Sequence, residues 1–251
     1  MVVFDKVLLR YGAGPDILHE VSFALSPGSF HFLVGPSGAG KSSLLRVMYL
    51  ALKPWSGLVS LFGRDVSALT RREIAEMRRG IGVVFQDFRL LDHLSALDNV
   101  ALPLRIAGAR EGEVQQNARE LLGWVGLGDH LEARPATLSG GQQQRIAIAR
   151  AIIGRPRLLL ADEPTGNVDD RIGLRLMHLF EELNKLGTTV VIATHNDSLV
   201  ERFRHPQLRI LHNSLQRVGA PAPAAPAAPT PPAPTPPATT PPATMSPGAT
   251  S

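Results

Sequence analysis

The chain has 251 residues, of which 44% are hydrophobic and 19% charged, so it can bury the core of one domain, with room for an inserted subdomain. The net charge is +4, but the basic residues are scattered and only 5% of residues are aromatic, which argues against a nucleic-acid surface. Cysteine is absent, which excludes disulfides, zinc–thiolate sites and thiol catalysis. We find neither a signal-peptide pattern nor an apolar run of about 18 residues, so we expect no membrane span.

The first part of the chain is predicted to be mostly strands. The pattern favours strands at 2–10, 21–25 and 30–34, a hairpin-like pair after Gly57, a short charged helix at 71–79 and a buried strand at 81–85. A helix is expected at 43–50. Between the third strand and this helix lies one glycine-rich loop.

That loop reads Gly35, Pro36, Ser37, Gly38, Ala39, Gly40, Lys41 and Ser42. A glycine-rich loop between a strand and a helix, ending in Lys-Ser, is the phosphate-binding P-loop in its usual context. The glycines let backbone N–H groups approach a phosphate, and the helix adds the positive end of its dipole. We therefore expect Lys41 to reach the β- and γ-phosphates of a nucleoside triphosphate, and Ser42 to ligate Mg²⁺.

The periodicity changes in the middle of the chain. From 87 to 154 apolar residues recur at helical spacing, which predicts an inserted helical subdomain. Buried strands return at 157–161 and 188–194, separated by an amphipathic helix at 172–186. Continuous apolar strands that alternate with helices are typical of a parallel α/β sheet.

Two carboxylates, Asp162 and Glu163, follow directly after the predicted strand 157–161. Ligands of open α/β sheets bind at the carboxyl ends of the strands. In a P-loop enzyme the first carboxylate holds Mg²⁺, here through water, so we assign that role to Asp162. Glu163 is then placed to orient or deprotonate the attacking water.

A second helix N-terminus is predicted to bind an anion. The residues Leu138, Ser139, Gly140, Gly141 and Gln142 precede a strongly helical stretch, with Ser139 as its N-cap. Two glycines leave the backbone bare at the start of this helix, which favours a phosphate there. Two phosphate-binding helix ends far apart in one chain are explained if the second faces the nucleotide of another copy.

Taken together, these motifs resemble the ATP-binding cassette (ABC) ATPases over about residues 1 to 217. The resemblance implies an α/β P-loop NTPase fold with an antiparallel β subdomain and an inserted helical subdomain, ATP and Mg²⁺ as cofactors, and an ATP-dependent homodimer. The stretch from Leu138 to Gln142 resembles the family's signature motif, which contacts ATP in trans.

Further residues take roles from this resemblance alone. Tyr11 is placed like the aromatic that stacks on adenine, and Ser43 falls within the ATP-binding loop region. Gln86 resembles the glutamine that senses Mg²⁺ and the γ-phosphate, and His195 the histidine that contacts the γ-phosphate. Asp169 matches the D-loop, although the preceding Gly166, Asn167 and Val168 depart from the commoner Ser-Ala-Leu.

Within the family, the stretch from Ile81 to Leu91, with the later segments 98–101 and 103–104, resembles a cell-division branch. Its members act with an integral membrane partner and relay a signal to cell-wall hydrolases, so we expect a cytoplasmic protein held at the inner face of the membrane. Lipoprotein-release, macrolide-export and solute-import ATPases are the alternatives. DNA-repair or translation ATPases would need a coiled-coil insertion or a second cassette, and a non-hydrolysing module would lack Glu163 or Gly140-Gly141.

A leucine-rich stretch follows Gln86, where the resemblance places the groove for a partner's helix. It comprises Phe88, Leu90, Leu91, Leu94, Leu97 and Leu102, and for most of these a place in the helical core is the simpler interpretation.

The predicted domain therefore spans 1–218, with a core of 1–86 and 155–218 and a helical subdomain of 87–154. Residues 219–251 are a proline-, alanine- and threonine-rich tail without charge, which cannot bury enough surface to fold and is expected to be disordered.

Overall fold

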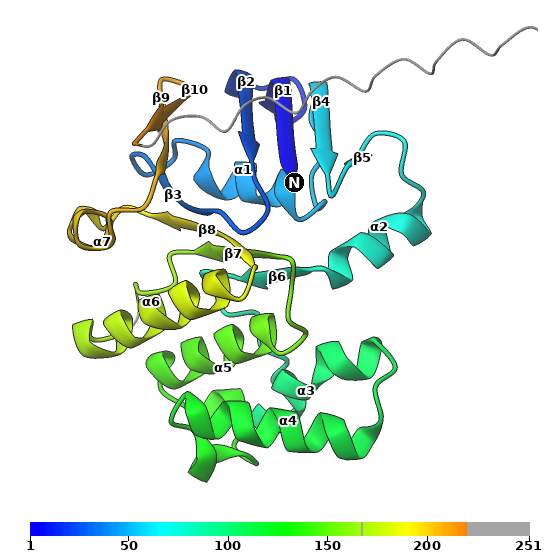
Figure 1. The fold of residues 1–251 in the computed structure, drawn as a ribbon, viewed down its shortest axis with the longest axis vertical. Helices are drawn as coiled ribbons and strands as arrows, with labels where there is room; N and C mark the ends of the chain where they lie inside the picture. The colour runs from blue at the N-terminus through cyan, green and yellow to red at the C-terminus, as the bar shows by residue number, and fades with distance from the viewer. Residues whose placement is uncertain (167, 220–251) are drawn as a thin grey trace, which may run out of the picture. The chain divides into compact units, whose positions relative to one another are not determined.

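The structure is a computed structural model, and it describes residues 1–166 and 168–219. These residues contain two sheets and the helices that pack on them (Figure 1). The antiparallel sheet has the order β2 (Asp16–Leu25), β1 (Val2–Arg10), β4 (Ser56–Leu61) and β5 (Arg64–Asp65). The other sheet has the order β10 (Ser214–Val218), β9 (Gln207–Leu211), β3 (Phe30–Val34), β8 (Thr189–Thr194), β7 (Leu158–Asp162) and β6 (Ile81–Val84). All its neighbouring pairs are parallel except β9 with β10. The predicted α/β fold with an antiparallel sheet is confirmed.

The helices are α1 (Lys41–Met48), α2 (Arg71–Arg79), α3 (Ala96–Ile106), α4 (Glu111–Trp124), α5 (Gly140–Ile152), α6 (Asp170–Lys185) and α7 (Asp197–Phe203). Short 3₁₀ turns lie at Gly128–His130 and Pro135–Thr137. Figure 1 shows α1 between the two sheets, and α3 and α4 at the opposite end of the molecule from β1, β2 and β4.

The parallel sheet is buried on both faces, which is why its strands read as continuous apolar runs. Along β7, Leu158 and Leu160 pack with α1 and the antiparallel sheet, whereas Leu159 and Ala161 pack with α5 and α6. Successive side chains of a strand point to opposite faces, so one five-residue strand serves two cores. With both faces covered by packing, functional groups gather at the ends of its strands.

A third apolar cluster joins the helices of the middle segment. Val100 of α3, Val114 and Leu122 of α4, and Ile146 of α5 are fully buried in it. Since α5 also contributes Ile148 and Ile152 to the cluster beneath the parallel sheet, this one helix connects the two cores. The exact boundaries of the helical subdomain stay a prediction.

The structure differs from the sequence-based elements mainly near the ends of segments. The P-loop helix begins at Lys41 rather than at 43, and β2 begins at Asp16 rather than at 21. The helix α7 and the strands β9 and β10 were not predicted. Asn167 and the tail from 220 onward lie outside the described residues. Within the described part of the chain, no helix is long and apolar enough to cross a membrane.

Candidate nucleotide-binding site

The carboxyl ends of β3, β6, β7 and β8 meet at one edge of the parallel sheet, and a cavity of about 540 Å³ opens there. Its lining is drawn from segments far apart in the sequence: Tyr11, Ile17, Ser37, Gly38, Gly40, Lys41, Ser42, Ser43, Gln86, Asp162, Glu163 and His195. Apart from Ile17, every one of these residues is among those singled out by the motifs. Gly35, Pro36 and Ala39 belong to the same loop without lining the cavity.

The P-loop turns tightly into α1 at Gly40, the N-cap of this helix. Gly40 has a φ of 100°, and a Cβ there would lie 2.8 Å from Cγ2 of Ile17, so a larger residue would be strained and crowded. Lys41, which is 8% exposed, donates hydrogen bonds from Nζ to the carbonyls of Gly35 at 2.8 Å and Pro36 at 3.1 Å. The ammonium therefore sits on carbonyl dipoles that a phosphate could replace.

Asp162 closes β7 on the floor of the cavity. Burial, and the neighbouring charge of Glu163, raise the pKa of Asp162 above its ordinary value, while the Ser42 hydroxyl and the charges of Lys41 and Arg46 oppose this shift. A carboxylate that burial disfavours gains most from a nearby cation, and the hydroxyl of Ser42 lies beside it.

Glu163 lies in a left-handed conformation, with a φ of 49°, which is rare for a residue with a side chain and is typical of functional sites. Its N–H bonds to the carbonyl of Ala193 at 2.9 Å, which anchors the turn to β8. The two carboxylate oxygens have different partners. Oε1 lies 2.7 Å from Nδ1 of His195, and Oε2 accepts a hydrogen bond from Oγ1 of Thr194 at 3.1 Å.

These two partners of Glu163 differ in exposure. The His195 side chain is 73% exposed, whereas Thr194 is 1% exposed and its hydroxyl also accepts from the N–H of Asn196 at 3.1 Å. Oε2 is therefore held by a buried group, while the partner of Oε1 is largely exposed to solvent. Sequence reasoning missed Thr194, because a threonine at a strand end carries no signal of its own.

Tyr11 stands at the rim, 45% exposed. Its hydroxyl lies 3.1 Å from Oγ of Ser43 and accepts a hydrogen bond from Arg46 at 3.3 Å. The hydrogen bond to Tyr11 raises the pKa of Arg46. Tyr11 thus lines the cavity while two residues of α1 contact its hydroxyl. Arg46 was a further residue that the motifs did not identify.

The second glycine-rich motif does not line this cavity. Ser139 is the N-cap of α5 in a capping box, accepting from the N–H of Gln142 at 3.3 Å while Gln142 Oε1 accepts from the N–H of Ser139 at 2.8 Å. Ser139 and Gly140 are exposed, whereas Leu138 is 8% exposed and packs in the helical cluster. Asp169 caps α6 by accepting from the N–H of Ile172 at 2.9 Å.

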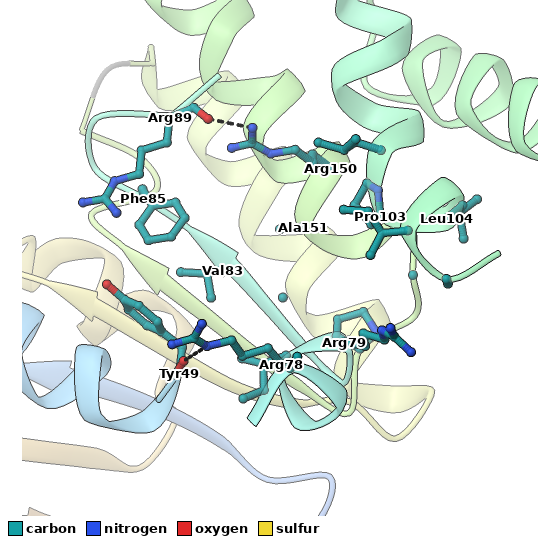
Figure 2. A pocket seen from close by; sticks show the side chains of 18 of the residues that line it. Tyr49, Arg78, Arg79, Val83, Phe85, Arg89, Pro103, Leu104, Arg150 and Ala151 are labelled. Atoms are coloured by element: carbon teal, nitrogen blue, oxygen red, sulfur yellow. Dashed lines mark hydrogen bonds between the residues drawn. The ribbon is translucent and has the colours of Figure 1, made fainter. Parts of the chain in front are cut away.

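A second, larger cavity of about 740 Å³ lies beside β6, α2, α3 and α5, and we call it the groove. Figure 2 shows its lining: Val83, Phe85 and Tyr49 on one side, Pro103 and Leu104 on the other, with Arg78, Arg79, Arg89 and Arg150 around them. Of the leucine-rich stretch, Leu91 and Leu102 line the groove, while Leu97 is buried in the helical cluster and Leu90 packs against it.

The comparisons with known proteins agree with this geometry. Residues 18–166 match the family model described as ABC transporter. The chain is 43% identical over 210 residues to the cell division ATP-binding protein FtsE of Escherichia coli K12, which covers 84% of this chain and 95% of that protein. It is 46% identical over 209 residues to FtsE of Haemophilus influenzae, covering 83% and 96%.

Among solved structures, the fold matches a dimeric ATP-binding cassette in a post-hydrolysis state bound to ADP and Pi. The TM-score is 0.81 at 36% identity, and the match covers 86% of this chain and 97% of that one. The chain therefore belongs to the ABC transporter family as an ATP-binding, ATP-hydrolysing subunit, and it is a homologue of the FtsE cell-division ATPases.

Proposed function

We propose that two copies of this chain close head to tail around two ATP·Mg²⁺, each held between the cavity of one copy and Ser139-Gly140-Gly141 of the other. The observation that carries this proposal is the separation of two phosphate-binding helix ends. The N-terminus of α1 lines the cavity, whereas the exposed N-terminus of α5 does not. In a single copy, only one of the two predicted phosphate-binding helix ends therefore lies at the nucleotide cavity. The dimeric ADP-bound relative supports pairing with a second copy, which would supply the other helix end.

The oxygen donors of the cavity fit Mg²⁺, which prefers hard oxygen ligands and keeps several waters and phosphate oxygens of its own. Ser42 and Gln86 would hold it directly, and Asp162 through water. Burial makes the charge of Asp162 costly without a cation, which favours this role. When bound, Mg²⁺ neutralises charge that develops on the phosphates.

Glu163 acts on the attacking water. We infer that Thr194 fixes Oε2, and that His195 leaves Oε1 to contact the γ-phosphate, so that Oε1 becomes free to accept the proton of the water. Lys41 exchanges the carbonyls of Gly35 and Pro36 for the β- and γ-phosphates. Tyr11 stacks on adenine, and Asp169 contacts the second copy from the N-terminus of α6.

Closure depends on the γ-phosphate because its charge is neutralised by both half-sites together. Hydrolysis cuts the bond between the β- and γ-phosphates and leaves ADP and inorganic phosphate in the site. Once that phosphate leaves, the two helix N-termini no longer have a common anion and the dimer opens. The ATPase cycle therefore becomes a cycle of closing and opening between two copies.

The test is Glu163→Gln. The substitution removes the base but keeps the shape, so hydrolysis should fall at least about a hundredfold while ATP still closes the dimer. Size-exclusion chromatography with ATP and Mg²⁺ should show a stable dimer for this variant. Glu113→Gln, an exposed position on α4, is the matched control and should behave as wild type. Steady-state hydrolysis at the wild-type rate in Glu163→Gln would contradict the assignment.

We further propose that the groove receives a helix of an integral membrane partner resembling FtsX, which holds this chain at the inner face of the membrane. Support comes from the likeness to FtsE and from the apolar lining around Val83, Leu102 and Leu104. An amphipathic helix buries its apolar face in such a groove. Through this contact ATP-driven closure would reach the membrane and regulate cell-wall hydrolysis during division.

A further inference from the structure

The segment between β6 and α3 belongs to both cavities at once. It runs from Phe85 to Ser95 without helix or strand. Gln86 lines the nucleotide cavity, whereas Phe85, Arg89 and Leu91 line the groove. The position of Gln86 is therefore set by whatever fixes this irregular segment.

Two consecutive residues of the segment are strained. Phe88 has a φ of 58° and Arg89 a φ of 49°, and bulky side chains rarely adopt this left-handed conformation. Such a conformation persists only where surrounding contacts hold it in place. Neither residue is a glycine, so the sequence does not make this turn easy by itself.

Arg150 supplies the contacts that reach the turn from α5, in addition to the local bonds of Phe88 to Phe85 and of Arg89 to Asp87. Its two terminal nitrogens donate separately, one to the carbonyl of Phe88 at 2.7 Å and the other to the carbonyl of Arg89 at 2.7 Å. Figure 2 shows the guanidinium reaching the carbonyl of Arg89 from α5. A planar, forked donor fixes the relative direction of two adjacent carbonyls, which a single ammonium does not.

The backbone of α5 next to Arg150 is packed tightly against β6, the strand that leads to Gln86. A Cβ on Gly82 would overlap the carbonyl of Ala151, the residue after Arg150, so β6 and the end of α5 approach as closely as glycine allows. The end of α5 that carries Arg150 and the strand before Gln86 are therefore packed together as one unit.

We propose that Arg150 is a positioning residue for Gln86, acting through the strained turn at Phe88 and Arg89. This inference rests on the role given to Gln86 under the proposed function. The new element is the role of α5: Ser139 caps the N-terminus of this helix, and Arg150 near its C-terminus sets the position of Gln86. Ser139 and Arg150 are eleven residues apart, about 16 Å along a helix, so a rigid α5 joins the surface offered to the second copy with the segment that contacts nucleotide.

The experiment compares Arg150→Met, Gln86→Ala and the double variant in the full-length chain with ATP and Mg²⁺. Arg150→Met should lower kcat about tenfold and leave the Kd for a fluorescent ATP analogue within twofold, because Gln86 is misplaced while the P-loop is intact. If Arg150 acts through Gln86, the double variant hydrolyses ATP within twofold of Gln86→Ala alone. Effects that multiply would mean a general structural role and overturn the proposal, as would an unchanged kcat in Arg150→Met.

Hydrogen exchange gives a readout that does not depend on turnover. Amides of 87–90 should exchange at least about threefold faster in Arg150→Met, and unchanged exchange would overturn the proposal that Arg150 holds the turn. Arg150→Lys keeps charge and stem but not the fork, so it should retain an intermediate kcat and covers the case in which the methionine variant fails to fold. Arg119→Ala, exposed on α4, is the control and should match wild type.

If Gln86→Ala hydrolyses ATP at the wild-type rate, the role of Gln86 fails and this inference fails with it. That result leaves the Glu163→Gln test of the proposed function untouched, so the two failures are distinguishable.

Discussion

The two cavities of this chain are built in opposite ways. The nucleotide cavity is lined by strand ends and the P-loop, and the chemistry proposed for it rests on Lys41, Asp162 and Glu163. The groove is larger, about 740 Å³ against 540 Å³, and is lined mostly by apolar side chains with arginines among them. Under the proposed function, the first binds ATP through fixed backbone geometry, whereas the second receives a helix of a membrane partner.

The difference shows where each property resides in the sequence. A phosphate site needs adjacent residues in a special backbone conformation, so it appears as a motif. A groove needs only apolar atoms from several elements, so most of its residues share no local pattern, and of the leucine-rich stretch only Leu91 and Leu102 line it. Tyr49, Pro103 and Arg150 line the same groove from three helices or their ends.

Lys41→Ala should impair the function of the nucleotide cavity and leave that of the groove intact. We expect it to cause the largest loss of ATP hydrolysis among the variants discussed below. Removing the ammonium leaves the phosphate charge without its point-charge partner, so hydrolysis should fall about a hundredfold or more. Steady-state ATPase assays measure this loss. Because Lys41 is not among the residues that line the groove, the variant should still co-purify with the FtsX-like partner in detergent.

Lys53→Ala, an exposed lysine outside the P-loop, is the matched control and should hydrolyse ATP normally. A Lys41→Ala chain with wild-type turnover would refute the phosphate-binding assignment.

Leu91→Asp should have the converse effect. Leu91 is 37% exposed and lines the groove, so a carboxylate there would have to lose water when an apolar helix docks. Recovery with the co-expressed membrane partner should fall at least about tenfold, while the ATPase rate of the isolated chain stays within twofold. Leu186→Asp is the control, because Leu186 is 84% exposed and lies after α6. Equal recovery of both variants would count against docking in the groove.

Most residues that line the nucleotide cavity were named from the sequence, while their roles stay predictions. Gly35 to Ser42 form a local motif, the pair Asp162-Glu163 gains its meaning beside that motif, and Tyr11, Gln86 and His195 were named through the family resemblance alone. Thr194 and Arg46 were missed for a physical reason. Each acts on a motif residue through a hydrogen bond that depends on strand register or a helix face, and neither residue type is unusual at its position.

The C-terminal strands were missed for a related reason. β9 has five residues and follows Pro206 directly, so it offers too little alternation to be recognised. Its pairing partner, β3, is more than 170 residues earlier, with Leu33 opposite Leu208. The unexpected extension of β2 toward Asp16 depends in the same way on tertiary contact, because Asn213 bonds to the carbonyl of Asp16.

Asn99→Ala tests what holds the groove side of the shared segment, with the smallest expected effect. Asn99 on α3 is fully buried, and its Oδ1 accepts from the N–H of Leu91 at 2.8 Å. Its Nδ2 donates to the carbonyls of Leu91, Leu94 and Ser95 at 3.0 to 3.3 Å. Alanine would leave these backbone groups partly unsatisfied, which should lower the free energy of unfolding by about 2 to 3 kcal/mol.

Chemical denaturation monitored by circular dichroism measures this loss, with the exposed Asn117→Ala on α4 as control.

The two ends of the segment from Phe85 to Ser95 should respond differently to Asn99→Ala. Amides near Leu91 and Leu94 lose protection, whereas Arg150 still holds Phe88 and Arg89, so the kcat of the isolated chain should change less than in Arg150→Met. If Asn99→Ala instead slowed hydrolysis as much as Arg150→Met, the segment would behave as one unit rather than as two separately anchored halves. The part of the segment at the nucleotide cavity and the part at the groove would then not be held independently of each other.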